Sequence, residues 1–582
     1  MNLGFLRHCK RITASAGALL GILALTSTGR AQTLKNGGFE GAYTPVTGSQ
    51  IAAISGSVAP GWEDNTSWAK VDVSYAPDTK VVHSGATSQR ITVRAGFAQF
   101  AQYVPMSAQV QTFRVWARAE KPMWVILSLR LVEAPYTSYA TQAARVGPAW
   151  TQLSVSARTP ARNCYALINS GLGTLWVDDA TLTSSANQLP QTLKPPAKRT
   201  IPREFFGLNA NHLTRNGTGY DWPAIEFGAF RNWDSEVIWP LIETSRGVYN
   251  WKALDADVAQ AQARGQKYLF TLGLTPNWAA SVPNTGTYAG SPSPPADLQD
   301  VRNFIHAVAT RYKGRIEAYE VWNEPDLPGC WTGTPAQLVA VERAMRAQLA
   351  LDDPAALLVA PPPSGATAFP FLDAYLAAGG GQACNAFAYH SYNVPEPDTG
   401  AASAFRSLLA AYGFGAKPVW VTETGSQRGT QSDADGASFL ARAYLLQWAS
   451  GVSRNYWYAY DNGLFFSLNQ QSKGKATQTP MALAADGIAY QQLQRWLVGA
   501  KMLSCASDAN GTWTAQVAYP DRQRGYIVWN PQGATRFSIP AKWKVVSRRD
   551  LAGNVGMVSG DTVTVDALPV EFLTGKANGA GR

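Results

Sequence analysis

The periodicity of hydrophobic and polar side chains changes twice along the chain. From residue 33 to 184 it alternates with a period of two, without a convincing helical stretch. Short apolar runs then alternate with amphipathic stretches up to about residue 500, and the period of two returns afterwards. We expect a β-sandwich at 32–185, an α/β region at 201–500 and a small β-sandwich at 501–576. Residues 186–200, which have three prolines, no aromatic residue and no periodicity, are predicted to be a linker.

Alternation within the first region predicts which side chains share a face. Segment 113–118 has apolar side chains at every second position, and Trp116 lies between two arginines on the other face. Segment 124–131 repeats this pattern, with Val125 and three leucines on one face and Trp124 and Arg130 on the other. We expect the apolar faces to form the sandwich core, and the two tryptophans to share a polar face with arginines.

The middle region contains eight strand-like runs with helical stretches between them. One helix has an apolar stripe from Leu298 to Tyr312, and the next begins with the capping box Thr334-Pro335-Ala336-Gln337. Eight such units predict a closed (β/α)8 barrel, whose catalytic groups lie at the carboxyl ends of the strands. The expected strands span residues 205–209, 228–233, 267–272, 316–322, 356–361, 386–390, 419–422 and 455–460.

The first 31 residues have the pattern of a secretory signal peptide. A basic start is followed by the apolar run 12–25 and by Gly29-Arg30-Ala31, a cleavage pattern of small residues. We expect cleavage after Ala31 and a secreted or periplasmic protein. A membrane anchor is the alternative, although the apolar run is shorter than the roughly 20 residues that span a bilayer. No later stretch predicts a transmembrane segment.

Charge and cysteine content exclude several classes of protein. The net charge of +10 is diffuse, without a Lys/Arg run or a nucleic-acid motif, so no nucleic-acid partner is expected. Beyond the signal segment, Cys164, Cys330, Cys384 and Cys505 are too widely spaced for a zinc site. Cys330 and Cys384 belong to opposite ends of the barrel, roughly 17 to 20 Å apart, which excludes a disulfide between them. A bridge between Cys164 and Cys505 stays open.

Two glutamates follow the fourth and the seventh expected strands of the barrel. Glu324 comes after segment 319–323, and Glu423 comes after segment 418–422. Both side chains should therefore reach the same mouth of the barrel. Two carboxyl groups about 5 to 5.5 Å apart are what a retaining glycosidase needs. The alternative makes them ordinary carboxylates on the rim of loops.

The residues around both glutamates resemble a known group of enzymes. Trp322-Asn323-Glu324-Pro325 and Thr422-Glu423-Thr424-Gly425 are similar to the acid/base and nucleophile motifs of the (β/α)8 retaining glycosidases of clan A. Segments 230–235, 245–251 and 388–392 resemble glycoside hydrolase family 39. The resemblance implies that Glu324 is the general acid/base and Glu423 the nucleophile. The family includes β-xylosidases, iduronidases and endo-acting hydrolases of exopolysaccharides, so it does not define the substrate.

Polar residues beside the two glutamates are candidates for binding the sugar or the nucleophile. Arg231, at the end of the second expected strand, is predicted to stabilise the ionised Glu423, or else to lie on the surface. Asn323 is predicted to donate to the sugar 2-hydroxyl, a hydrogen bond that strengthens in the transition state. His390 and Tyr392, after the sixth strand, are expected to position the nucleophile or the sugar, and a satisfied core histidine is the alternative for His390.

Three tryptophans near the predicted mouth are candidates for sugar stacking. Trp457 would form the floor beneath the sugar, or would pack in the core. Trp278 and Trp331 lie on the loops after the third and fourth strands, where they would stack on sugar or cover hydrophobic loops.

Motifs in the first region resemble the jelly-roll carbohydrate-binding modules of xylanases and cellulases. They are Asn36-Gly37-Gly38-Phe39-Glu40, Pro60-Gly61-Trp62 and segment 175–179. This resemblance implies a sugar site that includes Trp116 and Trp124, unless that face packs on the neighbouring domain. It also implies a structural calcium ion at Glu40 and Asp179.

Together these patterns predict a retaining hydrolase of β-linked sugars in an extracellular or cell-surface polysaccharide, without a catalytic cofactor. Neither endo or exo action nor the oligomeric state is predicted. One alternative is a non-catalytic carbohydrate-binding protein on a hydrolase fold, and another is a cell-wall scaffold that uses only its β modules.

Overall fold

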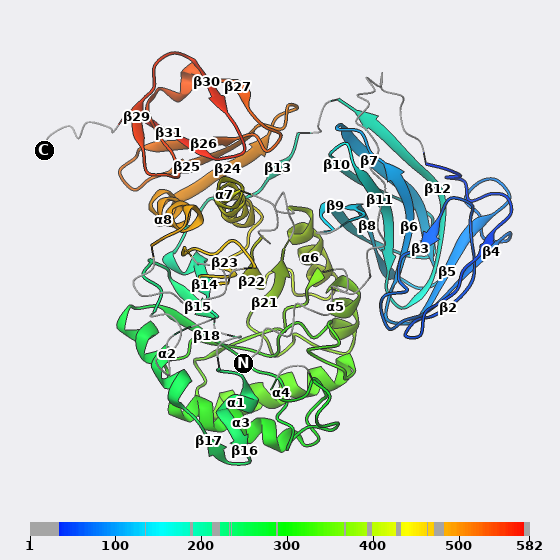
Figure 1. Ribbon diagram of the computed structural model, residues 1–582, viewed down its shortest axis with the longest axis horizontal. Helices are drawn as coiled ribbons and strands as arrows, with labels where there is room; N and C mark the ends of the chain where they lie inside the picture. Colours follow the sequence, from blue (N-terminus) through cyan, green and yellow to red (C-terminus); the bar gives the residue numbers. More distant parts are fainter. Residues whose placement is uncertain are drawn as a thin grey trace, which may run out of the picture.

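Three folded parts follow one another in the computed structural model of the chain (Figure 1). A central barrel is flanked by an N-terminal and a C-terminal β-sandwich. The structure describes residues 34–133, 136–186, 190–211, 213, 222–231, 233, 236–286, 289–365, 368–392, 399–426, 432–462, 464–470 and 482–575. The predicted signal peptide lies outside the described residues.

The barrel consists of eight parallel strands, as the hydrophobic pattern predicted. Neighbouring strands are paired in the order β20-β19-β18-β15-β14-β23-β22-β21, and a parallel bridge between Val359 and Ala386 closes the ring. The strands are β14 Phe206–Asn209, β15 Ala229–Arg231, β18 Lys267–Thr271, β19 Ala318–Glu320, β20 Leu357–Val359, β21 Phe387–Ser391, β22 Val419–Thr424 and β23 Arg454–Trp457. Most are shorter than expected, because the paired ladder ends before the apolar run does.

Helices surround this ring and bury their apolar stripes against it. They are α1 Trp239–Ile242, α2 Lys252–Ala263, α3 Leu298–Arg311, α4 Pro335–Asp352, α5 Ala368–Ala377, α6 Thr399–Ala411, α7 Asp433–Ala449 and α8 Ala485–Leu497. The predicted capping box is present, since the Thr334 side chain accepts from the Gln337 amide at the start of α4. Two short strands after α1, β16 Glu243–Ser245 and β17 Val248–Tyr249, form a hairpin.

Two sheets form the N-terminal β-sandwich, and their strands pair in antiparallel except for the parallel pair β2 and β4. One has the strand order β1-β2-β4-β5-β12-β7-β10 and the other β3-β6-β11-β8-β9. The strands are β1 Thr44–Pro45, β2 Ala53–Val58, β3 Glu63–Asp64, β4 Asp72–Asp78, β5 Ser88–Ala95, β6 Ala98–Pro105, β7 Val110–Ala119, β8 Met123–Leu131, β9 Ser138–Val146, β10 Thr151–Arg158, β11 Asn163–Ser170 and β12 Gly173–Ser185. As predicted, Phe113, Val115 and Leu127 lie in the core between the sheets.

The expectation that Trp116 and Trp124 share a face was wrong. Trp116 lies on β7 in one sheet and Trp124 on β8 in the other, so their outward faces point in opposite directions. Trp124 is buried in the hydrophobic cluster of the barrel; its strand β8 contacts α5, and the neighbouring strand β9 contacts α6. Alternation defines which side chains share a face of one strand, but not which sheet the strand joins.

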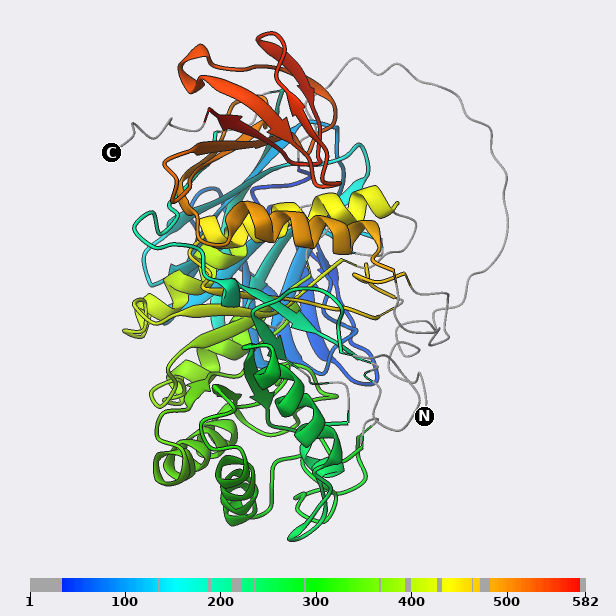
Figure 2. The ribbon, with the colours of Figure 1, turned by 90° about the vertical axis from the view of Figure 1, so that its left-hand side faces the viewer.

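The C-terminal β-sandwich packs on the barrel through α7 and α8, which lie side by side beneath it (Figure 2). Its larger sheet has the order β13-β24-β25-β26-β31-β28-β29, and β27 pairs with β30. The strands are β24 Lys501–Ser507, β25 Trp513–Ala518, β26 Arg524–Trp529, β27 Thr535–Ser538, β28 Val545–Arg549, β29 Val555–Met557, β30 Thr562–Val565 and β31 Val570–Thr574. The predicted linker supplies β13 Thr192–Leu193, so the linker is part of this sheet.

Two further predictions concern the whole chain. All four cysteines beyond the signal segment are free and buried, so Cys164 and Cys505 form no bridge. Among the described residues, no helix is both long and apolar enough to cross a membrane.

Candidate active site

Alternation along the barrel strands places a polar layer above an apolar one. Ala229, Ala318 and Ala388 form a small cluster inside the ring, together with other apolar side chains. The next residue on the same face of each strand is Arg231, Glu320 or His390. Successive side chains of a strand point to opposite faces, so the three polar groups face the barrel interior near its carboxyl end.

The two glutamates reach this end from opposite sides of the ring. Glu324 follows β19 with a left-handed backbone conformation, φ 41°, which a residue other than glycine adopts only under local constraint. Glu423 lies on β22, next to His390 on the adjacent strand β21. One oxygen of each carboxylate and Nδ1 of His390 all lie within 4.8 Å of one another. The sequence-based expectation that the two carboxyl groups converge is therefore confirmed.

Arg231 connects the residues of the site and is fully buried. Its Nη1 donates to Oε1 of Glu423 at 2.6 Å, and its Nη2 donates to Oδ1 of Asn323 at 2.7 Å. Its Nε donates to Oε2 of Glu320 at 2.8 Å. Although burial acts to lower the pKa of Arg231, the charges of Glu320 and Glu423 raise it. Arg231 thus forms a buried ion pair with Glu423, and the alternative of a surface arginine is wrong.

Residues that the sequence analysis did not single out hold Arg231 in place. Thr271 Oγ1 donates to the same Glu320 oxygen at 2.8 Å. Asn209 accepts from Arg231 at 3.4 Å and donates to the Thr422 carbonyl at 3.2 Å. Alternation along β19 places Glu320 on the same face as Ala318, inside the barrel. This pattern in the sequence could have marked Glu320 as a candidate.

Tyr392 and His390 both contact the predicted nucleophile. The Tyr392 hydroxyl donates to Oε2 of Glu423, and His390 Nδ1 lies 3.5 Å from the same oxygen and 2.9 Å from Oε1 of Glu324. Burial lowers the pKa of His390 to about 4. The imidazole is therefore neutral above that pH and adds no full positive charge between the carboxylates.

The two glutamates differ in their electrostatic surroundings. Burial raises the pKa of Glu324, while a hydrogen bond with Ser364 and the charge of Arg231 oppose the rise. Glu423 instead accepts from the Arg231 guanidinium and the Tyr392 hydroxyl. Donors of this kind favour an ionised carboxylate. The Glu324 side chain is also the more exposed of the two, 16% against 8%.

The tertiary structure corrects two of the predicted stacking platforms. Trp457 has no exposed surface and lies in the hydrophobic core, and its Nε1 donates to the Phe466 carbonyl at 3.0 Å. Trp331 is 4% exposed and packs edge-on against Trp322, with ring centroids 5.0 Å apart. Both therefore cover or fill the core, which was the competing interpretation.

Trp278 remains partly exposed, but it is not free. Its Nε1 donates to the Glu243 carbonyl at 3.2 Å, and Arg246 lies over its ring. These contacts hold the indole against the β16–β17 hairpin. Sugar stacking on Trp278 stays a prediction.

A different pair of aromatic side chains lies beside Tyr392, which contacts Glu423. Tyr458 follows the buried Trp457 and is partly exposed, as is Phe465. Their rings lie 5.3 Å apart, and Phe465 lies 5.4 Å from the ring of Tyr392. The apolar pattern of 455–460 did not define the end of the eighth strand, so it did not indicate that Trp457 is buried and the next residue, Tyr458, partly exposed.

The predicted sites of the N-terminal β-sandwich are only partly exposed. His83 stacks on Trp116 with ring centroids 4.1 Å apart, so one face of this indole is covered. Oδ2 of Asp179 contacts the His83 ring at 2.5 Å, and Oε1 of Glu40 accepts from the Ala86 amide at 2.7 Å. A structural calcium ion at Glu40 and Asp179 stays a prediction.

One group of described residues has the spacing of metal ligands, namely Glu324, His390 and Glu423. A cation there would compete with Arg231, which already places a positive charge beside Glu423. The arrangement therefore fits two carboxylates that act in acid/base and nucleophilic chemistry.

Two protein-family models match the barrel. Residues 295–481 match the glycosyl hydrolase catalytic core, and residues 230–329 match glycosyl hydrolase family 10. The first match contains both Glu324 and Glu423. This part of the barrel is therefore similar to the glycosyl hydrolase catalytic core.

Two family 39 enzymes are among the similar solved structures. A family 39 glycoside hydrolase from the gut symbiont Bacteroides cellulosilyticus WH2 is 16% identical and covers 78% of this chain and 95% of its own, with a TM-score of 0.53. At this identity the likeness establishes a common fold. A family 39 β-xylosidase from Caulobacter crescentus is 16% identical and covers 66% of this chain and 99% of its own, with a TM-score of 0.47.

Sequence similarity to a characterised protein is limited to a short stretch. Endo-1,4-beta-xylanase 5 from Arabidopsis thaliana is 30% identical over 129 residues. The match spans 22% of this chain and 22% of that protein, so the chain covers about a fifth of this relative's length.

Proposed function

We propose that the glycosyl hydrolase barrel of this chain cleaves β-linked sugars of a xylan-like polysaccharide with retention of anomeric configuration. The observation that carries this proposal is the convergence of Glu324 and Glu423, whose nearest ligand atoms lie within 4.8 Å together with His390. Retaining glycosidases have their two carboxyl groups about 5 to 5.5 Å apart, whereas inverting ones leave room for a water molecule at roughly 6.5 to 9.5 Å.

In the first step the Glu423 carboxylate attacks the anomeric carbon, and the bond to the leaving oxygen breaks. Glu324 transfers its proton to that oxygen, which leaves a glycosyl ester on Glu423 and an ionised Glu324. The raised pKa of Glu324 supports its role as the proton donor. The hydrogen bonds from Arg231 and Tyr392 orient the Glu423 carboxylate and favour its ionised form.

In the second step Glu324 acts as a base and removes a proton from water, whose oxygen attacks the same carbon and releases Glu423. The change of role follows from charge. While Glu423 is esterified it carries no negative charge, so the repulsion that favours protonated Glu324 is absent. Asn323, held by Arg231, is proposed to donate to the 2-hydroxyl of the sugar in both steps.

The substrate class rests on the comparisons and on the exposed aromatic side chains. The Arabidopsis relative is named an endo-1,4-beta-xylanase. Tyr458 and Phe465, beside Tyr392, offer apolar faces of the kind on which sugar rings stack. The basic and apolar start of the sequence further supports export of the enzyme through a signal peptide cut after Ala31.

The anomeric configuration of the first product tests the mechanism. Wild-type protein incubated with xylan and with a panel of other β-glycans is expected to release the β-anomer first, as observed by proton NMR before mutarotation. Glu423→Ala should lose turnover by several orders of magnitude because no covalent intermediate can form. Glu317→Ala is a suitable control, since Glu317 pairs with Arg454 below the active site.

Three results would reject the proposal. They are initial release of the α-anomer, unchanged turnover of Glu423→Ala, and tight glycan binding without turnover by wild type. The last result would favour a non-catalytic carbohydrate-binding protein. The lengths of the released products distinguish endo from exo action.

A further inference from the structure

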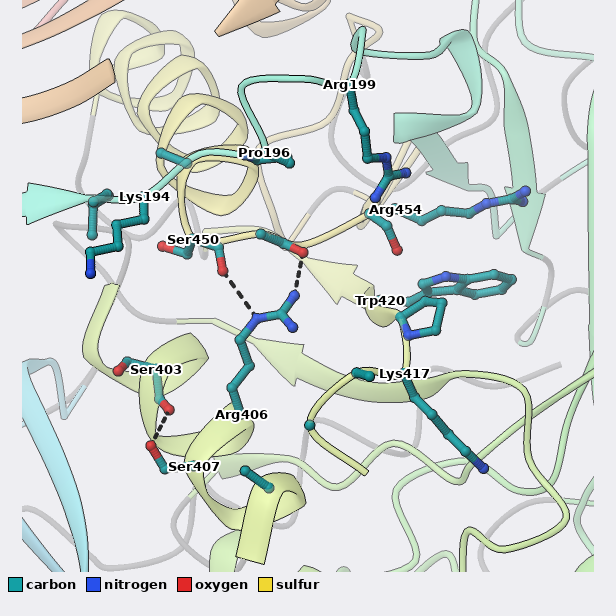
Figure 3. A pocket seen from close by; sticks show the side chains of 18 of the residues that line it. Lys194, Pro196, Arg199, Ser403, Arg406, Ser407, Lys417, Trp420, Ser450 and Arg454 are labelled. Carbon is teal, nitrogen blue, oxygen red and sulfur yellow. Dashed lines mark hydrogen bonds between the residues drawn. The ribbon is translucent and has the colours of Figure 1, made fainter. Parts of the chain in front are cut away.

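A cavity of about 930 Å³ lies at the end of the barrel opposite the two glutamates (Figure 3). Trp420 and Arg454, near the amino ends of β22 and β23, form part of its wall. The linker from Thr192 to Arg199 forms a second wall, and Arg406 of α6 belongs to a third. Substrate bound at Glu423 would not reach this cavity, because the barrel interior is filled by packed side chains.

The lining is strongly basic. Five cationic side chains and a single carboxylate, Glu204, are among its residues, all of which the structure describes. Two of the five are engaged elsewhere. Arg454 pairs with Glu317 at 2.6 Å, and the Lys417 amine donates to the carbonyls of Gly381 and Cys384. The cations that remain are Lys194, Arg199 and Arg406.

Arg406 is half-buried and projects toward the middle of the cavity (Figure 3). Its Nε donates to the Ser450 carbonyl at 3.2 Å, and its Nη2 donates to the Gly451 carbonyl. A guanidinium has five N–H groups, so these two bonds fix its plane and leave donors for a ligand. Burial lowers the pKa of Arg406, and no carboxylate among the described residues compensates its charge.

Arg199 extends from the linker toward the same space from the opposite wall (Figure 3). Its guanidinium lies 5.8 Å from the ring centre of Trp448, which restricts where the charge can move. Lys194 adds another exposed cation on the same segment. None of these three cations forms an ion pair within the part of the chain that the structure describes.

We propose that this cavity is a binding site for an oxyanion, held between Arg199 and Arg406. A carboxylate, sulfate or phosphate group matches the planar fork of a guanidinium and would neutralise the uncompensated charge of Arg406. Such a ligand would also join the linker to α6 and to the start of β22. The site is separate from hydrolysis and does not depend on the proposed function.

Isothermal titration calorimetry of the full chain at constant ionic strength tests this site. The probes are sodium sulfate, sodium glucuronate and glucose. Wild-type protein is expected to bind sulfate or glucuronate, and not glucose. Arg406→Gln and Arg199→Gln should each weaken that binding at least tenfold. Arg495→Gln, which removes an exposed arginine of α8 outside the cavity, should leave it unchanged within twofold.

Using two arginine variants separates a loss of anion binding from a loss of folding. Arg406 bonds two carbonyls and its loss could disturb α6, whereas the Arg199 side chain is exposed and donates no hydrogen bond among the described residues. Tighter binding of glucuronate than of sulfate identifies an acidic sugar as the ligand, and equal binding identifies a free oxyanion. The proposal fails if neither anion binds, if Arg199→Gln binds like wild type, or if Arg495→Gln loses as much affinity.

Discussion

Arg231 has no exposed surface, yet its three nitrogens donate to four acidic or amide side chains, and the three shortest of these bonds reach Glu320, Glu423 and Asn323. Only a planar fork with donors in several directions can serve Glu320, Glu423 and Asn323 at once. Sequence reasoning could place Arg231 near Glu423 from strand order. Alternation could place Glu320 on the inner face of β19, but it could not identify Glu320 as the partner that orients Arg231, because β18 separates β15 from β19 and the two side chains meet only in the folded barrel.

We expect Arg231→Lys to lower kcat at least a hundredfold with a much smaller change in KM. Lysine keeps the charge but cannot hold Glu423 and Asn323 in one plane, so the nucleophile loses its orientation. Steady-state kinetics on an aryl β-glycoside measure the effect. Arg246→Lys, at an ion pair whose arginine side chain is 65% exposed, serves as the control. Equal losses in kcat for both variants would contradict this role of Arg231.

The raised pKa of Glu324 predicts the alkaline side of the pH profile. Proton donation requires the neutral acid, so kcat/KM should stay high above the ordinary pKa of glutamate and fall as pH rises through the raised pKa. Glu324→Gln should lose this fall when the substrate has a good aryl leaving group that needs no proton. Persistence of the same alkaline fall in Glu324→Gln would assign it to another group.

The lowered pKa of His390 predicts that the protein loses stability as pH falls. Its pKa is lowered to about 4 in the folded barrel, so the unfolded chain binds more protons between pH 4 and 6.5. Its contribution, on the order of 3 kcal/mol, is therefore present above pH 6.5 and lost as pH falls toward 4. Thermal unfolding across this range should show a smaller acid loss for His390→Asn than for wild type. His306→Asn, at an exposed histidine, should behave like wild type.

At the scale of elements, local signals predicted helix starts and strand faces well. The capping box of α4 and the apolar stripe of α3 are both present as expected. Both depend on residues a few positions apart, whose interactions form within one helix. The end of β23 was harder to predict, because Trp457 and Tyr458 are both aromatic and only barrel closure determines which one is buried.

Thr334→Ala should lower the free energy of unfolding by about 1 kcal/mol, since it removes the side-chain acceptor for the Gln337 amide. Denaturant unfolding of the barrel measures the loss. Thr310→Ala, at an exposed position inside α3, should change stability by less than about 0.5 kcal/mol. A similar loss in the free energy of unfolding for both variants would show that the capping hydrogen bond does not stabilise the barrel.

At the scale of the whole molecule, the three parts share surfaces. Trp124, Ile126 and Ala143 of the N-terminal β-sandwich belong to the hydrophobic cluster of the barrel. The linker strand β13 pairs with β24 of the C-terminal sheet. These shared surfaces hold the N-terminal β-sandwich in a defined position. Trp116 lies on the sheet that contains β7, on the side of this sandwich that faces away from the barrel.

Trp124→Ala should destabilise the protein by about 3 kcal/mol or more, because it leaves a cavity where the two parts meet. It should not reduce retention on insoluble xylan. Trp116→Ala is the matched variant, and it should leave the melting temperature nearly unchanged while weakening retention if the exposed face of the Trp116 indole binds sugar. A stable Trp124→Ala variant would contradict the packing described above.

Local periodicity suffices to predict the barrel, its two sandwiches and the two converging glutamates, because strand faces and strand order depend on neighbouring residues and on a regular repeat. The contacts of Arg231, the burial of Trp457 and Trp331 and the opposite faces of Trp116 and Trp124 depend instead on which distant segments pack together. Burial is a property of the surroundings rather than of a residue. It also sets the unequal environments of Glu324 and Glu423, so the proposed division of acid and nucleophile has its physical cause in the folded barrel.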